Sequence, residues 1–183
     1  MRVYIDTGIF IDYLNGHSSI GASLRSANRR GRTPQQLAQD ASTVFQRIVR
    51  QHQGATSALT CCEAEEALYA ELVKAARGVP NAKKLLVPTA RSIVLQVVTA
   101  AQFFRINILD LSNEVINLQL SQLQLHTRGV RAADSLHLAT AITFDADIVL
   151  AGDRHILSLN NRLMNARDRP IRCCDTDIAL TIL

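Results

Sequence analysis

The chain has 183 residues, enough for one domain with a sizeable core, and 48% of them are hydrophobic. Aromatic residues make up 4% and Trp is absent, so aliphatic side chains have to fill that core. This composition excludes a disordered or low-complexity chain. The net charge of +4 permits a nucleic-acid partner but does not require one.

The four cysteines form two adjacent doublets, Cys61–Cys62 and Cys173–Cys174. Neither doublet has the spacing of a zinc site, and free cysteines pack as small hydrophobic residues, so we expect buried thiols in a reducing compartment. The opening residues lack the pattern of a signal peptide, and no uncharged apolar run is long enough to span a membrane. We therefore expect a cytoplasmic protein without a membrane partner.

Short apolar runs that are typical of strands alternate with longer amphipathic stretches that are typical of helices. The expected strands lie at 3–5, 55–58, 106–109, 147–150 and 171–173, and the expected helices at 9–14, 34–52, 60–77, 82–104, 113–125 and 131–142. Thr33 and Ser112 are expected to cap helices, and Thr60 to form a capping box with Glu63. Pro88 is expected to mark a bend or a restart.

This alternation predicts an α/β fold, a three-layer α/β/α sandwich around a mostly parallel sheet, in a single domain over 1–183. The basic stretch at about 17–32 has weak helical periodicity and is interpreted as a surface insertion. Three roles remain open for it: guiding a substrate, contacting a partner, or forming a disordered loop.

Four acidic residues fall where expected strands give way to loops or helices. Asp6 and Asp153 follow strands directly, and Glu63 and Asp134 lie in first helical turns. Ligands of such sheets bind beyond the carboxyl ends of the strands, so these acids are expected to meet. Crowded carboxylates repel one another unless a proton or a cation lies between them, and Mg²⁺ prefers a few oxygen ligands in an open site. The helix dipole alone also explains an acid at Glu63 or Asp134.

Four segments in family order resemble the motifs of the PIN domain, in particular the VapC-like toxin ribonucleases. These segments read VYIDTGIFIDYL at 3–14, SALTCCE at 57–63, RAADSLHLATA at 131–141 and VLAGDR at 149–154. The third segment is the most specific. Ala151 departs from the pattern, because many relatives carry Thr or Ser there.

The resemblance implies that Asp6, Glu63, Asp134 and Asp153 are the catalytic, metal-binding acids and that the side chain of Thr7 supports them. It implies Mg²⁺ as the cofactor, with Mn²⁺ as a substitute, and RNA as the substrate. It also implies a homodimer and a cognate antitoxin protein of a type II toxin–antitoxin pair. An endoribonuclease that hydrolyses RNA phosphodiester bonds is the leading interpretation.

Other polar residues near the motifs have two interpretations each. Arg131 and Arg154 flank two of the acids and either bind RNA phosphates or balance the acidic charge. His137 lies one turn beyond Asp134, where packing is favoured over a general-base role. Asp12 is either a supporting carboxylate or a solvated one. The acids Asp145, Asp147, Asp175 and Asp177 are expected at turns, with Asp175 or Asp177 near the site if the last strand lies beside it.

Other functions remain as alternatives. A phosphotransferase of the haloacid-dehalogenase type also begins with a strand that ends in Asp, but it needs a second Asp where this chain has Gly8. A non-catalytic metal-binding or RNA-binding module, and a housekeeping RNA-processing nuclease, fit the same acids. Cleavage of RNA distinguishes the enzymes from the binding module.

Overall fold

The computed structural model describes residues 1–24 and 28–183, so Arg25 of the basic stretch lies outside the described residues. In chain order the elements are β1 (Arg2–Ile5), α1 (Thr7–His17), the 3-10 turn η1 (Gly21–Ser23), α2 (Pro34–Gln51), β2 (Gln53–Ser57), α3 (Leu59–Ala75), α4 (Ala82–Phe103), β3 (Ile106–Leu109), α5 (Asn113–Ser121), α6 (Leu123–Thr127), α7 (Ala132–Thr143), β4 (Ile148–Leu150), α8 (Arg154–Leu157), β5 (Arg172–Cys174) and α9 (Thr176–Ile182).

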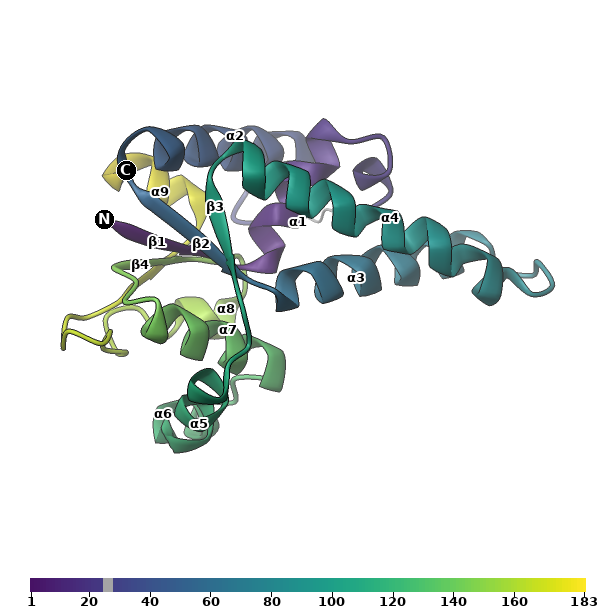
Figure 1. The fold of residues 1–183 in the computed structure, drawn as a ribbon. Coiled ribbons are helices and arrows are strands. Elements are labelled where there is room, and N and C mark those ends of the chain that lie inside the picture. Colours follow the sequence, from purple (N-terminus) through teal and green to yellow (C-terminus); the bar gives the residue numbers. More distant parts are fainter. Residues whose placement is uncertain (25–27) are drawn as a thin grey trace.

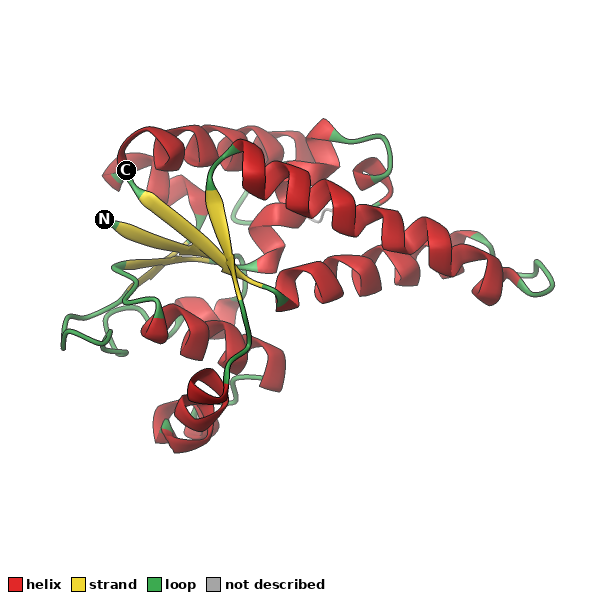
Figure 2. Cartoon of the chain, viewed as in Figure 1, coloured by secondary structure: helices red, strands yellow, loops and turns green. Residues whose placement is uncertain are grey.

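The five strands form one sheet in the order β3-β2-β1-β4-β5, and every pair of neighbours is parallel. Helices α1, α2 and α9 cover one face of this sheet, and α5 to α8 lie on the other (Figure 1). The yellow strands of Figure 2 therefore stand between two red helical layers. The predicted three-layer α/β/α fold is confirmed, with a sheet that is parallel throughout.

The alternation of side chains along β1 supplies both halves of the core. Val3 and Ile5 point into a cluster with the inner sides of α1, α2 and α4, whereas Tyr4 points into a second cluster with α7. Successive residues of a strand face opposite sides of a sheet, and all three of these side chains are completely buried. The short strands are apolar because both of their faces are covered.

The carboxyl ends of three strands finish at one level. Ile5 of β1 is aligned with Leu150 of β4, which is aligned with Cys174 of β5. The residues that follow, among them Asp6 and Asp175, therefore start from the same edge of the sheet. The strand order reverses between β1 and β4, and ligands of open α/β sheets bind in the crevice at such a reversal.

Helices α3 and α4 form an arm that extends away from the sheet (Figure 1). By length and composition alone, the segment Lys84–Phe103 of α4 is long and apolar enough to cross a membrane, a property that core helices of water-soluble proteins share. The segment packs along α3 and carries Lys84 and Arg91, so it is not an uncharged run.

Several local predictions need correction. Helix α3 begins at Leu59, with Ala58 at the N-cap position and no side-chain cap, so the capping box of Thr60 and Glu63 is wrong. Helix α4 runs through Pro88 without ending, so a restart there is wrong, whereas a bend stays a prediction. The helix after Ser112 ends at Ser121, and a separate short helix, α6, follows it. The capping roles of Thr33 and Ser112 are confirmed.

Part of the basic stretch folds inward. Arg29 and Arg32 pair across a tight turn in which Arg30 and Gly31 have φ values of 51° and 76°. Paired residues that flank a two-residue turn have side chains on the same side. The side chains of Arg29 and Arg32 are 21% and 13% exposed, so the expectation of a surface insertion does not hold for them.

Candidate metal centre

Asp6 lies at the point where β1 ends and α1 begins. Its backbone N–H donates to the carbonyl oxygen of Leu150 at 2.9 Å, which fixes it beside β4. Its carboxylate caps α1 and accepts a hydrogen bond from the backbone N–H of Gly8 at 3.2 Å. With 8% of its surface exposed, Asp6 is a buried carboxylate, and no Lys or Arg of the described residues pairs with it.

Glu63 reaches the same place from the second turn of α3. One of its oxygens, Oε2, accepts hydrogen bonds from the hydroxyl of Thr7 and from the ring of His137, the latter at 2.7 Å. Thr60, which was expected to cap α3, instead places its hydroxyl 3.2 Å from that of Thr7 and 2.7 Å from that of Thr56. The Glu63 carboxylate is thus held by tertiary contacts, and the capping explanation for it is removed.

His137 connects α7 to this group. Its Nε2 atom lies 2.7 Å from Oε2 of Glu63, 3.2 Å from Oγ1 of Thr7 and 3.9 Å from Oδ1 of Asp6. Its Nδ1 atom lies 2.7 Å from the hydroxyl of Tyr4. The ring is buried, as the packing interpretation predicted, but polar contacts occupy both of its nitrogens.

Asp134 is the third residue of α7, one turn before His137, as the sequence predicts. Asp153 follows β4 and caps α8, because its Oδ1 atom accepts a hydrogen bond from the backbone N–H of His155 at 2.6 Å. The charge of Asp153 raises the pKa of Asp134, so the two carboxylates are close enough to interact. We call Asp6, Glu63, Asp134 and Asp153 the acid cluster.

The pKa values show how these charges interact. Burial raises the pKa of Asp6 to about 6, against a weaker lowering by His137, and the charges of Glu63 and Asp134 add to the rise. Burial, then Asp153 and Glu63, raises the pKa of Asp134. Burial also acts to raise the pKa of Glu63, but the hydrogen bond from His137 reverses that and lowers it. Burial and neighbouring charges therefore disfavour the ionised forms of Asp6 and Asp134.

Burial disfavours protonation of His137, yet its pKa is raised. The hydrogen bond to Glu63 and the charges of Asp6 and Glu63 outweigh the loss of solvent. In the described part of the chain, the His137 ring is also the one basic side chain within 4 Å of the carboxylates of Asp6 and Glu63.

The donor set fits a hard divalent cation. Carboxylate oxygens are the ligands that Mg²⁺ prefers, and a cation would offset the burial and, to a lesser extent, the repulsion that raise the pKa of Asp6. Within residues 1–24 and 28–183, however, no three acidic, His or Cys side chains already surround a common point at ligand distance. A hydrated Mg²⁺ needs only a few carboxylates, because it keeps several of its waters, and Asp6 and Glu63 would be the first of them.

The flanking arginines are exposed. Arg131 stands at the N-cap position of α7 and its charge lowers the pKa of Asp134, while Arg154 opens α8 beside His155. Neither residue pairs with the acid cluster within 4 Å in the described chain, so phosphate binding by them stays a prediction.

Asp12 and Asp175 have arginine partners, unlike the residues of the acid cluster in the described chain. Asp175 accepts hydrogen bonds from Arg29 at 2.8 and 3.0 Å and from Arg32 at 2.5 Å, and Asp12 accepts one from Arg29 at 2.6 Å. We call Arg29 and Arg32 the arginine clamp. It engages both acids, so Asp175 does not join the acid cluster. The sequence carries no local signal for these pairs, because Arg29 and Asp175 are 146 positions apart.

Comparison with known proteins places this geometry in a fold class. No family model matches the chain, and no curated protein matches it. Among solved structures it is similar to a chain of VapBC2 from Rickettsia felis, which was crystallised bound to a DNA fragment from their promoter. The match covers 96% of this chain and 98% of the other with a TM-score of 0.54. At 12% identity this likeness shows the fold.

Proposed function

We propose that this chain is a Mg²⁺- or Mn²⁺-dependent endoribonuclease that hydrolyses RNA phosphodiester bonds at the acid cluster. The observation that carries the proposal is the convergence of Asp6 and Glu63 on His137, their one basic neighbour within 4 Å in the described chain, at the reversal of strand order, where the charge of Asp134 also acts on Asp6. The ion-paired acids elsewhere in the described chain have arginine or lysine partners. Buried carboxylates without such partners are typical of cation sites.

A bound divalent cation supplies charge stabilisation and lowers the pKa of a bound water in phosphodiester hydrolysis. The chain itself orients the carboxylates. Asp6 is fixed by its backbone bond to β4 and by Gly8, and Glu63 by Thr7 and His137. Arg131 and Arg154 are exposed beside Asp134 and Asp153, where they would bind the phosphates of an RNA strand.

The motifs and the likeness to VapBC2 support a narrower proposal, that the chain is the toxin of a type II toxin–antitoxin pair. On this proposal it forms a homodimer, acts in the cytoplasm and binds a cognate antitoxin protein. A housekeeping RNA-processing nuclease and a non-catalytic binding module are the competing outcomes of the experiments below.

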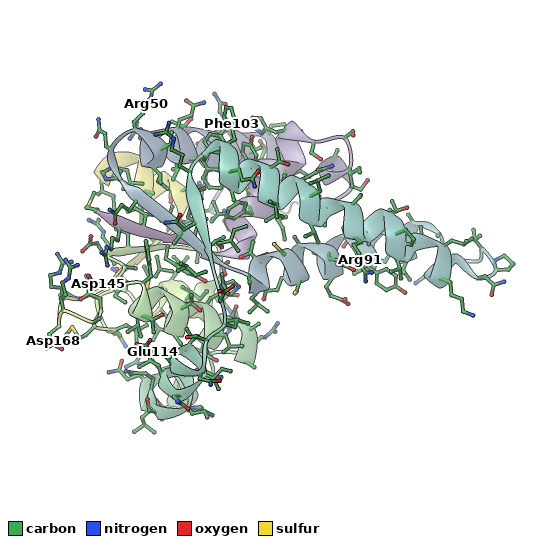
Figure 3. All side chains as sticks on the ribbon, in the orientation of Figure 1. Arg50, Arg91, Phe103, Glu114, Asp145 and Asp168 are labelled. Atoms are coloured by element: carbon green, nitrogen blue, oxygen red, sulfur yellow. The ribbon has the colours of Figure 1, made fainter. Side chains whose placement is uncertain are left out.

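The first experiment incubates the purified chain with a mixed RNA pool in Mg²⁺ or Mn²⁺, with and without chelator. Asp6→Asn and Asp134→Asn remove one carboxylate each and are expected to abolish cleavage. Asp168→Asn is the matched control, since Asp168 is exposed and lies on the side of the molecule away from the α3–α4 arm (Figure 3). Cleavage that persists in chelator, or in both variants, would overturn the proposal.

The second experiment separates the toxin from the housekeeping enzyme. Induced expression of the unaltered chain is expected to arrest bacterial growth, and Asp6→Asn is expected to relieve the arrest. Cleavage in vitro without growth arrest would favour RNA processing. Absence of cleavage of any RNA would leave the binding module.

A further inference from the structure

Two hydrogen-bond donors meet on one oxygen of Glu63. The hydroxyl of Thr7 and the Nε2 atom of His137 both bond to Oε2. No hydrogen bond within residues 1–24 and 28–183 involves the other oxygen, Oε1, and the Glu63 side chain is 29% exposed. The carboxylate is therefore anchored at one oxygen while the other remains available.

The orientation of His137 depends on Tyr4. The Tyr4 hydroxyl lies 2.7 Å from Nδ1 of the ring, and the two rings pack edge to face with centroids 5.9 Å apart. Tyr4 is completely buried, and its hydroxyl holds the ring at the nitrogen that does not face Glu63. Because Nε2 faces a carboxylate oxygen, which accepts, Nε2 carries a proton and donates to Glu63 whether or not Nδ1 is protonated as well.

We infer that Tyr4, His137 and Thr7 are positioning residues that fix Glu63 through Oε2, so that Glu63 binds the metal through Oε1 alone. This inference rests on the proposed metal-dependent function. Partners that orient a metal ligand in this way set both its direction and its basicity. The three residues come from β1, α1 and α7, so the arrangement connects three elements at the reversal of strand order.

The same contacts oppose a general-base role for His137. Both ring nitrogens have protein partners, and Nε2 is engaged with Glu63 and Thr7. A general base needs a nitrogen that is free to accept a proton from the attacking water. His137 acts instead through Glu63.

Titration calorimetry tests the inference by measuring the affinity of the full chain for Mn²⁺ in the absence of RNA. His137→Leu removes the donor and is expected to weaken Mn²⁺ binding about 10- to 100-fold. His137→Gln keeps an N–H donor at similar reach and is expected to restore most of the affinity. Tyr4→Phe is expected to weaken Mn²⁺ binding about two- to tenfold, because it removes the hydrogen bond to Nδ1 of His137 but keeps the imidazole ring and its bond to Glu63.

Tyr13→Phe is the matched control, since it removes a hydroxyl from a second tyrosine, which is partly buried against the core, and it is expected to bind Mn²⁺ like the unaltered chain. Thermal unfolding of every variant checks that the fold is kept. If His137→Leu does not fold, Tyr4→Phe and His137→Gln decide the outcome. Unchanged Mn²⁺ affinity in Tyr4→Phe and in any folded His137→Leu would overturn this inference and leave the proposed function standing.

RNA cleavage provides a second readout. Raising the Mn²⁺ concentration is expected to restore the cleavage rate of His137→Leu if the residue only positions a ligand. A rate that stays low at saturating Mn²⁺ would overturn the positioning role and favour a general base. Absence of Mn²⁺ binding by the unaltered chain would overturn the proposed function and this inference with it.

Discussion

Asp6 and Asp175 occupy equivalent places in the fold and have opposite surroundings. Each directly follows a parallel strand, each caps the next helix through its own carboxylate, and each is followed by Thr. The strand ends before them are aligned through Leu150, so two strand spacings, about 10 Å, separate them along the edge of the sheet. Both residues are buried.

Their ion-pair partners differ. Asp175 receives both residues of the arginine clamp, and although burial acts to raise its pKa, the hydrogen bond and charge of Arg29 lower it. Asp6 has no such partner in the described chain, and burial raises its pKa to about 6. The same local pattern therefore supplies a structural ion pair when an arginine reaches it and a carboxylate without a counter-charge when none does.

The largest expected effect is on stability. Asp175→Asn leaves Arg29 and Arg32 beside a neutral side chain and is expected to lower the free energy of unfolding by about 3–4 kcal/mol. Asp6→Asn removes a crowded, buried charge and is expected to leave stability unchanged or raise it. Urea unfolding at pH 7 in chelator measures both. Equal losses in the two variants would contradict the comparison.

The second-largest effect is expected in the pH dependence of the free energy of unfolding, to which Asp6 contributes. Its pKa is about 6 in the folded chain against an ordinary 3.8, so between these pH values the folded chain holds a proton that the unfolded chain has released. The free energy of unfolding therefore falls as pH rises through this interval, by about 3 kcal/mol at most from this group. Subtracting the curve of Asp6→Asn from that of the unaltered chain, in chelator, isolates it. A flat difference curve would refute the shift.

Asp175 contributes with the opposite sign. Its lowered pKa means that the folded chain releases the proton first, so its stabilisation is present above the ordinary pKa and is lost as pH falls. The difference curve of Asp175→Asn is thus expected to slope the other way from that of Asp6→Asn.

A smaller effect is expected where the arginine clamp touches the turn before Asp153. A methyl group on Gly152 would lie 2.6 Å from Nη1 of Arg29, whose guanidinium is held by Asp12 and Asp175. Gly152→Ala is therefore expected to cost about 1–2 kcal/mol of stability. In an Arg29→Ala background the same substitution should cost almost nothing. A cost that is equal in both backgrounds would show that Arg29 is not the obstacle.

The smallest effect is expected on the α3–α4 arm. Arg91 pairs with Glu65 at 3.2 Å, but its side chain is 70% exposed (Figure 3). Arg91→Ala is expected to change the free energy of unfolding by less than about 0.5 kcal/mol, since water screens such pairs. The same urea series measures it, and a loss as large as that of Asp175→Asn would mean that exposure does not separate the two kinds of pair.

The sequence predicts the fold because its signals are local. Apolar runs that alternate with amphipathic stretches are enough for a parallel sheet between helices, and the positions of Asp6 and Asp134 follow from the ends of a strand and the start of a helix. The capping box at Thr60 failed because a hydroxyl that could cap a helix found tertiary partners in Thr7 and Thr56. Local propensity cannot weigh such competition.

The surroundings of the acids could not be predicted, because they depend on distant residues. Glu63 and His137 are 74 positions apart, and Arg32 and Asp175 are 143 apart. The spacing of His137 from Asp134 indicates a shared helix face but not a bond to Glu63. The tertiary fold alone determines which buried acid pairs with an arginine.

The order of the strands also has a consequence for synthesis. β1 is made first, yet one of its two neighbours is β4, and the acids next to them are Asp6 and Asp153. The ribosome adds about 5–20 residues per second, so the 147 positions between these two acids (153 − 6) take roughly 7–30 s to translate. On the proposed function, a nascent chain carries an incomplete acid cluster until β4 emerges, and it is expected to leave the ribosome and its own messenger RNA uncleaved until then.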